Sequence, residues 1–327
     1  MKLITKTIKW IAKIVAGLII LLLISGLCFR LLSSKPVPPG EIIDVNGTKL
    51  HIRAEGKKND LPTLILESGA GGDTDVFHWF SEELKKNMRV IRYDREGKWF
   101  SESSNDKITP EYYAQQLHSL LETNGEKPPY ILVGHSMGGI YNRIFRDLYP
   151  NEVKAMVFLD SSHPEQWKRL DENGLIEKNQ ISLIKLIAVL SDMGIVGAYN
   201  AISNPKPIDE HLPKVCQNRK QNLTSYSGKV YRRFLKENSI NIDILSRAGQ
   251  SRKLDSLPVL VFTAKKQYGD SQAWFEMQKE LKELSSKGKH FYIDGNHGSI
   301  ITKKENAEII NKEILLLAES IEKKNYK

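Results

Sequence analysis

A serine set among glycines is the feature of this chain with the clearest chemical potential. Residues 134–139 read GHSMGG. An apolar run at 130–133 that predicts a strand directly precedes them, and a helical pattern at 137–149 begins at the residue after Ser136. A strand, a sharp turn and a helix in that order hold the serine of a G-x-S-x-G sequence strained and exposed. Glycine is needed at 134 and 138 because a side chain there would collide with the helix or strand. Ser136 is therefore the candidate nucleophile, and a small-residue turn without catalysis is the structural alternative.

A serine hydroxyl is a weak nucleophile and needs a base that accepts its proton. Of the eight histidines, His297 lies in the segment DGNHG at 294–298, between the last expected strand and the terminal helix. This late position fits the chain order nucleophile, acid, histidine, so His297 is the predicted base. Four other histidines lie in strand, helix or insertion patterns without neighbouring turn residues, and they are therefore less suited to be the base: His51, His118, His211 and His290.

Two aspartates are candidates for orienting that histidine. Asp160 ends the expected strand 155–159, and Asp270 lies in the loop after the expected strand 259–263. Asp270 has a competing role as the N-cap of the next helix. Asp160 leaves a rigid strand directly, and rigid supports favour catalytic geometry. We therefore favour Asp160 and keep Asp270 as the rival acid.

An oxyanion needs hydrogen-bond donors that are in place before the reaction. One predicted donor is the backbone N–H of Met137, at the start of the helix after Ser136, where free N–H groups attract negative charge. The second is the backbone N–H of Ala70 in the glycine-rich loop SGAGG at 68–72. Gly69 and His135 are candidate substrate-binding residues beside these donors, although the His135 ring is expected to point away from the site. This chemistry requires no metal and no cofactor.

Short β-branched runs that alternate with amphipathic stretches must position these residues, a pattern typical of an α/β protein. We expect a mostly parallel eight-stranded sheet flanked by helices, whose first two strands form a hairpin at Asn46-Gly47. The expected strands are 41–45, 49–54, 63–67, 89–93, 130–133, 155–159, 259–263 and 290–293. The expected helices are 75–87, 110–123, 137–149, 271–284 and 303–323.

The segment 161–256 interrupts this alternation and is too long for a simple crossover. It contains helical patterns, and we interpret it as a helical lid or cap over the carboxyl edge of the sheet. Packing on the flank of the domain is the alternative. The predicted domains are thus an anchor at 1–35, a core formed by 36–160 and 257–327, and the insertion at 161–256.

The N-terminal segment is typical of a membrane anchor. Residues 14–29 carry no charge, and the expected transmembrane span of about 10–32 covers roughly 34 Å as a helix. Four lysines precede the charge-free run 14–29, which by the positive-inside rule places the N-terminus in the cytoplasm and the catalytic domain outside. We therefore predict a single-pass cell-membrane protein. A cleaved signal peptide is the main competitor, but no small-x-small cleavage site follows the apolar run.

The net charge of +9 does not predict nucleic-acid binding, because six basic residues and no acidic residue lie within 1–35. The rest of the chain carries only +3. The two cysteines, Cys28 and Cys216, do not predict a disulfide framework, since Cys28 lies in the apolar leader.

The chain resembles the α/β-hydrolase superfamily, in its bacterial membrane-anchored esterase- and lipase-like branch. The stretches that carry the resemblance are 67–72, 93–97, 134–139 and 159–164, within about 41–320. The resemblance implies an eight-stranded core, Ser136 as nucleophile, His297 as base and backbone donors at Ala70 and Met137. Two departures stand out: Trp99 occupies the place of a usual second glycine, and the loop after 259–263 is rich in lysine.

We therefore expect a serine hydrolase that cleaves a carboxylic ester, or a related small or amphiphilic acyl compound, through an acyl-enzyme. The alternatives on the same fold are a thioesterase, a lysophospholipase, an amidase, a cofactor-free haloperoxidase, and a catalytically silent binding protein.

Overall fold

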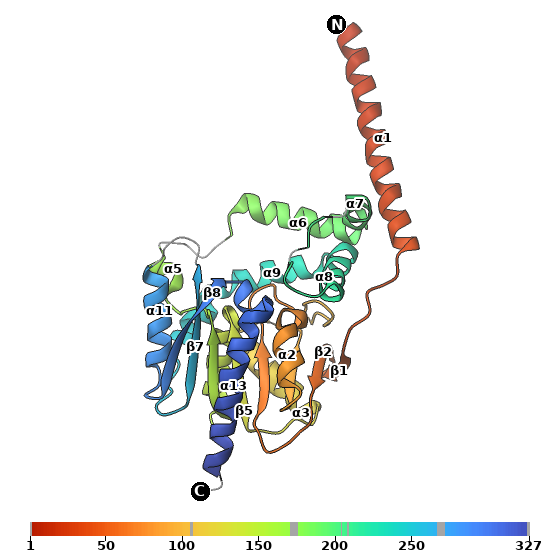
Figure 1. Ribbon diagram of the computed structural model, residues 1–327. Coiled ribbons are helices and arrows are strands. Elements are labelled where there is room, and N and C mark those ends of the chain that lie inside the picture. The colour runs from red at the N-terminus through yellow and green to blue at the C-terminus, as the bar shows by residue number, and fades with distance from the viewer. Residues whose placement is uncertain are drawn as a thin grey trace. The chain divides into compact units, whose positions relative to one another are not determined.

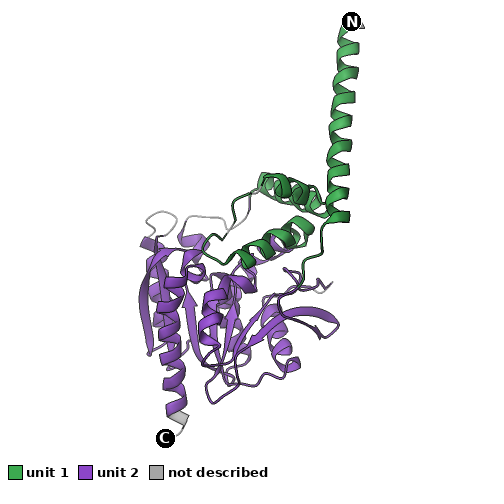
Figure 2. Ribbon diagram, turned by 45° about the vertical axis from the view of Figure 1, so that its right-hand side comes forward, with its two compact units in different colours: residues 1–37, 177–232 green, residues 38–176, 233–327 purple. Residues whose placement is uncertain are grey.

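The computed structural model describes residues 2–104, 107–170, 176–203, 205–207, 209–266 and 272–325. These residues form two compact units, and each unit combines two separate segments of the chain (Figure 2). Unit 1 contains residues 1–37 and 177–232, and unit 2 contains residues 38–176 and 233–327. The two units are therefore interleaved along the sequence.

Unit 2 is built on one eight-stranded sheet with the strand order β1-β2-β4-β3-β5-β6-β7-β8. Figure 1 labels β1, β2, β5, β7 and β8 of this sheet. β2 is antiparallel to both of its neighbours, β1 and β4, and all other neighbouring strands are parallel. The predicted fold class, an eight-stranded mostly parallel sheet flanked by helices, is confirmed. The strands are β1 Glu41–Val45, β2 Thr48–Glu55, β3 Thr63–Glu67, β4 Val90–Tyr93, β5 Tyr130–His135, β6 Val153–Leu159, β7 Val259–Lys266 and β8 Gly288–Asn296.

Helices cover both faces of the sheet. Successive strand residues point to opposite sides, and apolar residues on each side pack against helices. Ile65 and Leu132 join the hydrophobic core beneath α3, α4 and α10. Leu64 and Val133 join the opposite core beneath α2, α12 and α13. The helices of unit 2 are η1 Thr74–Phe77, α2 His78–Leu84, α3 Tyr112–Thr123, α4 Met137–Leu148, α5 Gln166–Arg169, α10 Asn241–Gly249, α11 Gln272–Glu283, α12 Ser299–Thr302 and α13 Lys304–Asn325.

The regular elements of unit 1 are all helices, over the residues that the structure describes. They are α1 Lys2–Leu32, α6 Lys178–Asp192, α7 Ile195–Ser203 and α8 Lys214–Tyr226, and α9 Lys229–Ser239 runs from unit 1 into unit 2. The described elements between β6 and β7 are likewise all helical. The predicted domain boundaries and the role of this insertion as a lid stay predictions.

The N-terminal helix has the length and composition needed to cross a membrane. Within α1, the candidate span is Leu3–Leu32; an 18-residue window of it has a mean hydropathy of 2.6, and 6% of that window is buried. Such a helix is a candidate anchor. Its orientation stays a prediction.

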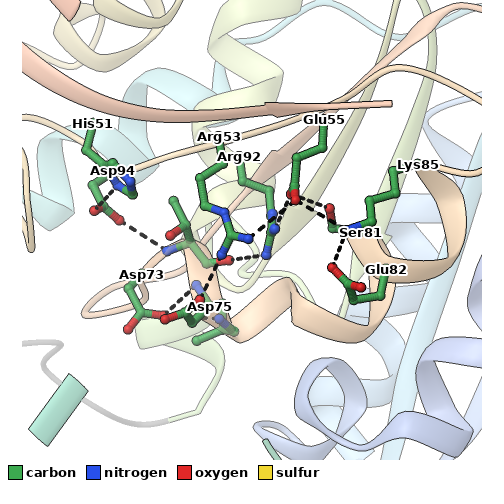
Figure 3. A network of polar contacts seen from close by, with 12 residues as sticks. His51, Arg53, Glu55, Asp73, Asp75, Ser81, Glu82, Lys85, Arg92 and Asp94 are labelled. Carbon is green, nitrogen blue, oxygen red and sulfur yellow. Dashed lines mark hydrogen bonds and ion pairs between the residues drawn. The ribbon is translucent and has the colours of Figure 1, made fainter. Parts of the chain in front are cut away.

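A polar network in unit 2 ties β2 and β4 to the turn that precedes α2 (Figure 3). The buried guanidinium of Arg92 donates to the Thr74 carbonyl at 2.9 Å and to the Glu55 carboxylate. The N–H of Thr74 donates to Asp94 Oδ1 at 3.1 Å, and Asp94 Oδ2 lies 2.7 Å from His51 Nδ1. The network therefore fixes the backbone that directly follows the glycine-rich loop 68–72.

Glu55→Gln should destabilise unit 2 in a pH-dependent way. Burial alone would raise the pKa of Glu55, but Arg92 lowers it from 4.5 to about 2. Because the pKa is lower in the folded protein, the ionised Glu55 stabilises the fold at pH values above 4.5, its pKa in the unfolded chain. This stabilisation is lost as the pH falls from 4.5 to about 2. We expect the variant to lose about 1 to 3 kcal/mol at pH 7, as for hydrogen bonds to charged groups. Urea unfolding of the detergent-solubilised full chain at several pH values checks this, and equal losses at pH 7 and pH 2 would contradict it.

Candidate active site

The turn between β5 and α4 holds Ser136 in a backbone conformation that side chains rarely adopt, with φ 53° and ψ −127°. A Cβ at Gly134 would collide with the backbone of Gly139, and a Cβ at Gly138 would collide with the carbonyl of Glu67. Such strain costs about 1 to 3 kcal/mol and persists only where the surroundings enforce it. The strand, turn and helix that the serine sequence predicts are all present.

His297 and Asp160 come together at the carboxyl edge of the sheet although they lie far apart in the sequence. His297 Nδ1 lies 2.7 Å from Asp160 Oδ2. The Asp160 side chain is fully buried, whereas the His297 side chain is 30% exposed. A carboxylate that accepts the Nδ1 proton leaves Nε2 as the unprotonated nitrogen of the neutral ring, which is the form a general base requires.

Two more donors fix the Asp160 carboxylate. The Ala264 N–H and Trp274 Nε1 both donate to Asp160 Oδ1 at 3.1 Å. Asp160 itself has a φ of 43°, in the left-handed region, so its backbone is strained like that of Ser136. The rival acid, Asp270, lies outside the described residues. The acid that the structure brings to His297 is therefore Asp160.

His135 lies against His297, and the expectation that its ring points away from the site is wrong. Its Nε2–H donates to the His297 carbonyl at 2.8 Å, and the two ring centroids are 4.5 Å apart. Burial, together with the neighbouring His297 ring, lowers the pKa of His135 to about 3, so it stays neutral at physiological pH. His135 thus positions the backbone of His297, a role that the sequence signalled only by its place next to Ser136.

The glycine-rich loop passes close to the nucleophile. A Cβ at Gly69 would lie 2.8 Å from the Ser136 Cβ, so only glycine allows this approach. The Arg95 guanidinium donates to the Ser68 carbonyl at 2.6 Å and to the Gly69 carbonyl at 2.8 Å. Because the peptide group is planar and trans, fixing the Gly69 carbonyl toward Arg95 turns the N–H of Ala70 the opposite way. Arg95 therefore sets the direction of the predicted oxyanion donor.

Trp99 braces the other end of this loop. Its indole Nε1 donates to the Gly72 carbonyl at 2.8 Å. Its φ is 40°, so the backbone takes the left-handed conformation that a glycine would adopt without strain. The side chain that replaces the usual glycine thus supplies a hydrogen bond to the loop.

Arg95 belongs to a buried ionic cluster that joins the loop to α9. It donates to the Glu67 carboxylate, and its Nε lies 3.4 Å from Glu237 Oε1. Lys98 Nζ lies 2.6 Å from Glu237 Oε2. Burial, together with Arg95, lowers the pKa of Lys98 to about 8, whereas Lys98 and Arg95 overcome burial and lower the pKa of Glu237 to about 2. The sequence did not reveal this cluster, because Arg95 and Glu237 are separated by 142 positions.

A cavity of about 20 Å³ opens beside Ala70 and Met137, with room for about one water molecule. The structure therefore brings the two predicted oxyanion donors to one small space. The other lining residues are Tyr141, Phe234, Glu237, Asn238 and Asn241.

One group of possible metal ligands occurs among the described residues, away from Ser136 in the sequence: His163, Glu165 and Glu280. Arg169 Nη1 donates to Glu280 Oε1 at 2.6 Å, so a guanidinium already compensates this acidic charge. The cluster carries no metal assignment.

Gly138→Ala should destabilise unit 2 by about 1 to 3 kcal/mol, the usual cost of overpacking. The added Cβ would press on the Glu67 carbonyl, which cannot move without disturbing β3. The control is Gly249→Ala at the end of α10, where the nearest atom to an added Cβ is Pro164 Cβ at an ordinary 3.4 Å. Thermal unfolding followed by circular dichroism checks the pair, and equal midpoints for both variants would contradict the expected crowding.

Comparison with known proteins identifies relatives of the same architecture. Residues 62–177 match the family described as alpha/beta hydrolase fold. The Bacillus subtilis protein YbdG is 29% identical over 178 residues, 51% of this chain and 53% of that protein. The hydrolase YraK of the same species is 27% identical over 157 residues, 45% of this chain and 56% of that protein. The chain thus spans about half the length of the curated relatives it matches.

Solved structures match over more of the chain. An esterase from Thermogutta terrifontis aligns with a TM-score of 0.59 and 18% identity, over 86% of this chain and 100% of that one. An enol-lactonase from Burkholderia xenovorans aligns with a TM-score of 0.56 and 19% identity, over 84% of this chain and 98% of that one. At such identities the likeness is one of fold.

Proposed function

We propose that the chain, whose residues 62–177 match the alpha/beta hydrolase fold family, is a serine hydrolase that cleaves carboxylic esters. The observation that carries the proposal is the 2.7 Å hydrogen bond between His297 and the buried Asp160, at the same sheet edge as the strained Ser136 turn. A nucleophile, a base and an orienting acid are the parts that acyl transfer requires.

In the proposed reaction, His297 Nε2 takes the Ser136 hydroxyl proton while Oγ attacks the ester carbonyl. The resulting imidazolium is stabilised by Asp160 and then gives the proton to the leaving alcohol as the C–O bond breaks. Water next attacks the acyl-enzyme, again with His297 as base, and Ser136 recovers its proton as the acid is released. Hydrogen bonds from Ala264, Trp274 and His297 to the Asp160 side chain favour its carboxylate form.

The oxyanion of each tetrahedral intermediate would be bound by the backbone N–H groups of Met137 and Ala70. Met137 is the first residue of α4, where N–H groups are free of helical partners. The cavity that Met137 and Ala70 share supports this assignment. Preorganised donors of this kind are worth about 2.7 to 4 kcal/mol each.

We propose that the enzyme works at the membrane, with α1 as an uncleaved anchor and the catalytic unit on the outer side. The length of α1 and the lysines before its apolar run support this orientation. The proposed substrate is a small or amphiphilic acyl compound. Gly69, which lies close to Ser136, is a proposed substrate-binding residue. Protease treatment of intact cells tests the orientation. A protease added outside the cells should digest unit 2 if this unit lies on the outer side of the membrane, and should leave it intact if the unit lies in the cytoplasm.

Labelling with a fluorophosphonate separates a hydrolase from a silent binding protein, because only an activated serine reacts. Ser136→Ala should abolish labelling and lower ester hydrolysis by at least about 10³-fold, with the fold unchanged. Ser320→Ala, on the exposed face of α13, is the control and should react like the wild type. Persistent labelling of the Ser136 variant would sink the assignment. A series of esters, thioesters and amides of graded acyl length then distinguishes the ester reaction from its alternatives.

Asp160→Asn should lower kcat by about 10⁴-fold, because an amide does not hold the His297 ring in the basic tautomer. Asp294→Asn is a matched control near the same histidine, since the Asp294 side chain is 86% exposed and pairs with Lys265. We expect the control to stay within about twofold of the wild type. Steady-state kinetics with a chromogenic ester measures both, and comparable losses in the two variants would argue against Asp160.

A further inference from the structure

Within unit 1, α7 packs against the C-terminal end of α1 through glycines. Gly26 is buried, and a Cβ there would collide with the Met193 carbonyl. A Cβ at Gly194 would collide with the Gly26 carbonyl, and a Cβ at Gly197 would collide with the Phe29 ring. Glycines from both partners thus allow the backbones to approach, as small residues do between membrane helices.

Polar contacts at the same end tie α1 to the neighbouring helices of unit 1. Arg30 Nε donates to the Asp192 carbonyl at 2.9 Å, and the Arg30 guanidinium lies 4.5 Å from the centroid of the Tyr226 ring. The Asp192 carboxylate accepts from the Gly228 N–H at 2.8 Å. The end of α1 is therefore an integral part of unit 1 rather than a free leader.

The position of this contact along α1 sets the depth of α7 in a membrane. Gly26 lies inside the charge-free run 14–29, four residues before Arg30. At 1.5 Å per residue, Gly26 is roughly 6 Å inside the end of the apolar span. If α1 crosses a bilayer, a helix packed on Gly26 must lie in the interfacial layer of that bilayer.

α6 and α7 expose large apolar side chains, as helices that lie in the membrane interface do. On α6, Leu183, Leu186 and Val189 follow one another at three-residue spacing and are 57%, 53% and 51% exposed. On α7, Tyr199 is 66% exposed and Ile202 is 87% exposed. Large apolar side chains that are half or more exposed on adjoining helices mark an interaction surface.

We propose that the corner formed by α6 and α7 is embedded in the lipid interface on the side where α1 ends. The bilayer is the occupant that fits, because α7, which carries part of this exposed apolar face, packs against the apolar helix α1. Helices of this kind lie in the plane of the interface with their apolar face about 5 to 10 Å deep. The proposal rests on membrane insertion of α1, which is part of the proposed function, but it needs no hydrolytic activity.

Depth-dependent quenching tests the proposal on the full chain in lipid vesicles. In a Cys28→Ser, Cys216→Ser background, Leu186→Cys and Ile202→Cys are each labelled with the fluorophore NBD. Leu21→Cys, within the α1 span, is the lipid-exposed reference, and Glu83→Cys, on a 52% exposed side chain of α2, is the water-exposed reference.

We expect doxyl-labelled lipid to quench positions 186 and 202 at least twofold more than position 83, and aqueous iodide to quench them correspondingly less. If position 21 is quenched by lipid while 186 and 202 respond only to iodide, the interface proposal is wrong although the anchor stands. Shielding of 186 and 202 from both quenchers means that protein covers the face, which also overturns it. Iodide access to position 21 would overturn the anchor and the interface proposal together.

A matched pair of glycine variants tests the contact on which the depth argument depends. Gly26→Val should disrupt the packing of α7 on α1 and raise the rate of tryptic cleavage within 177–232 several-fold. Gly17→Val lies in the same helix, where an added Cβ would meet nothing within 4 Å, and should leave the rate unchanged. Equal cleavage rates in the two variants would show that α7 does not depend on Gly26 for its packing, and would overturn the proposal.

Discussion

The buried carboxylate of Asp160 places a demand on much of unit 2, because a buried charge is stable only when its hydrogen bonds are satisfied. The donors to Asp160 come from the loop after β8, from β7 and from α11. These elements must therefore be correctly placed before the charge can be tolerated. The adjacency of β6, β7 and β8 in the sheet is what makes this arrangement possible.

The glycine-rich loop on the other side of Ser136 depends on a second set of buried charges. Arg95 holds two of its carbonyls, and Glu67 and Glu237 compensate the guanidinium. A full charge is thus used to orient a neutral peptide group. Because Glu237 lies on α9, the conformation of the loop is coupled to the helical segment that precedes β7.

The sequence predicted those parts of the fold and site that local patterns encode. The eight strands, the Ser136 turn and the late loop carrying His297 follow from strand length, glycine spacing and chain order. The choice between Asp160 and Asp270 stayed open, because both follow strands that end at the same edge. The orientation of His135 and the pairing of Arg95 with Glu237 were missed. Both depend on packing between segments that are far apart in the sequence, and neither produces a periodic pattern of residue types.

The interleaving of the two units has a consequence for how the chain is made. α1 leaves the ribosome before α7, its glycine-packed partner, which follows about 160 residues later; at 5 to 20 residues per second the delay is roughly 10 to 30 s. During that interval the end of α1 lacks the contacts that α7 later makes with it. A shortened chain that begins after residue 37, a usual route to water-soluble material, would leave α7 without this neighbour permanently.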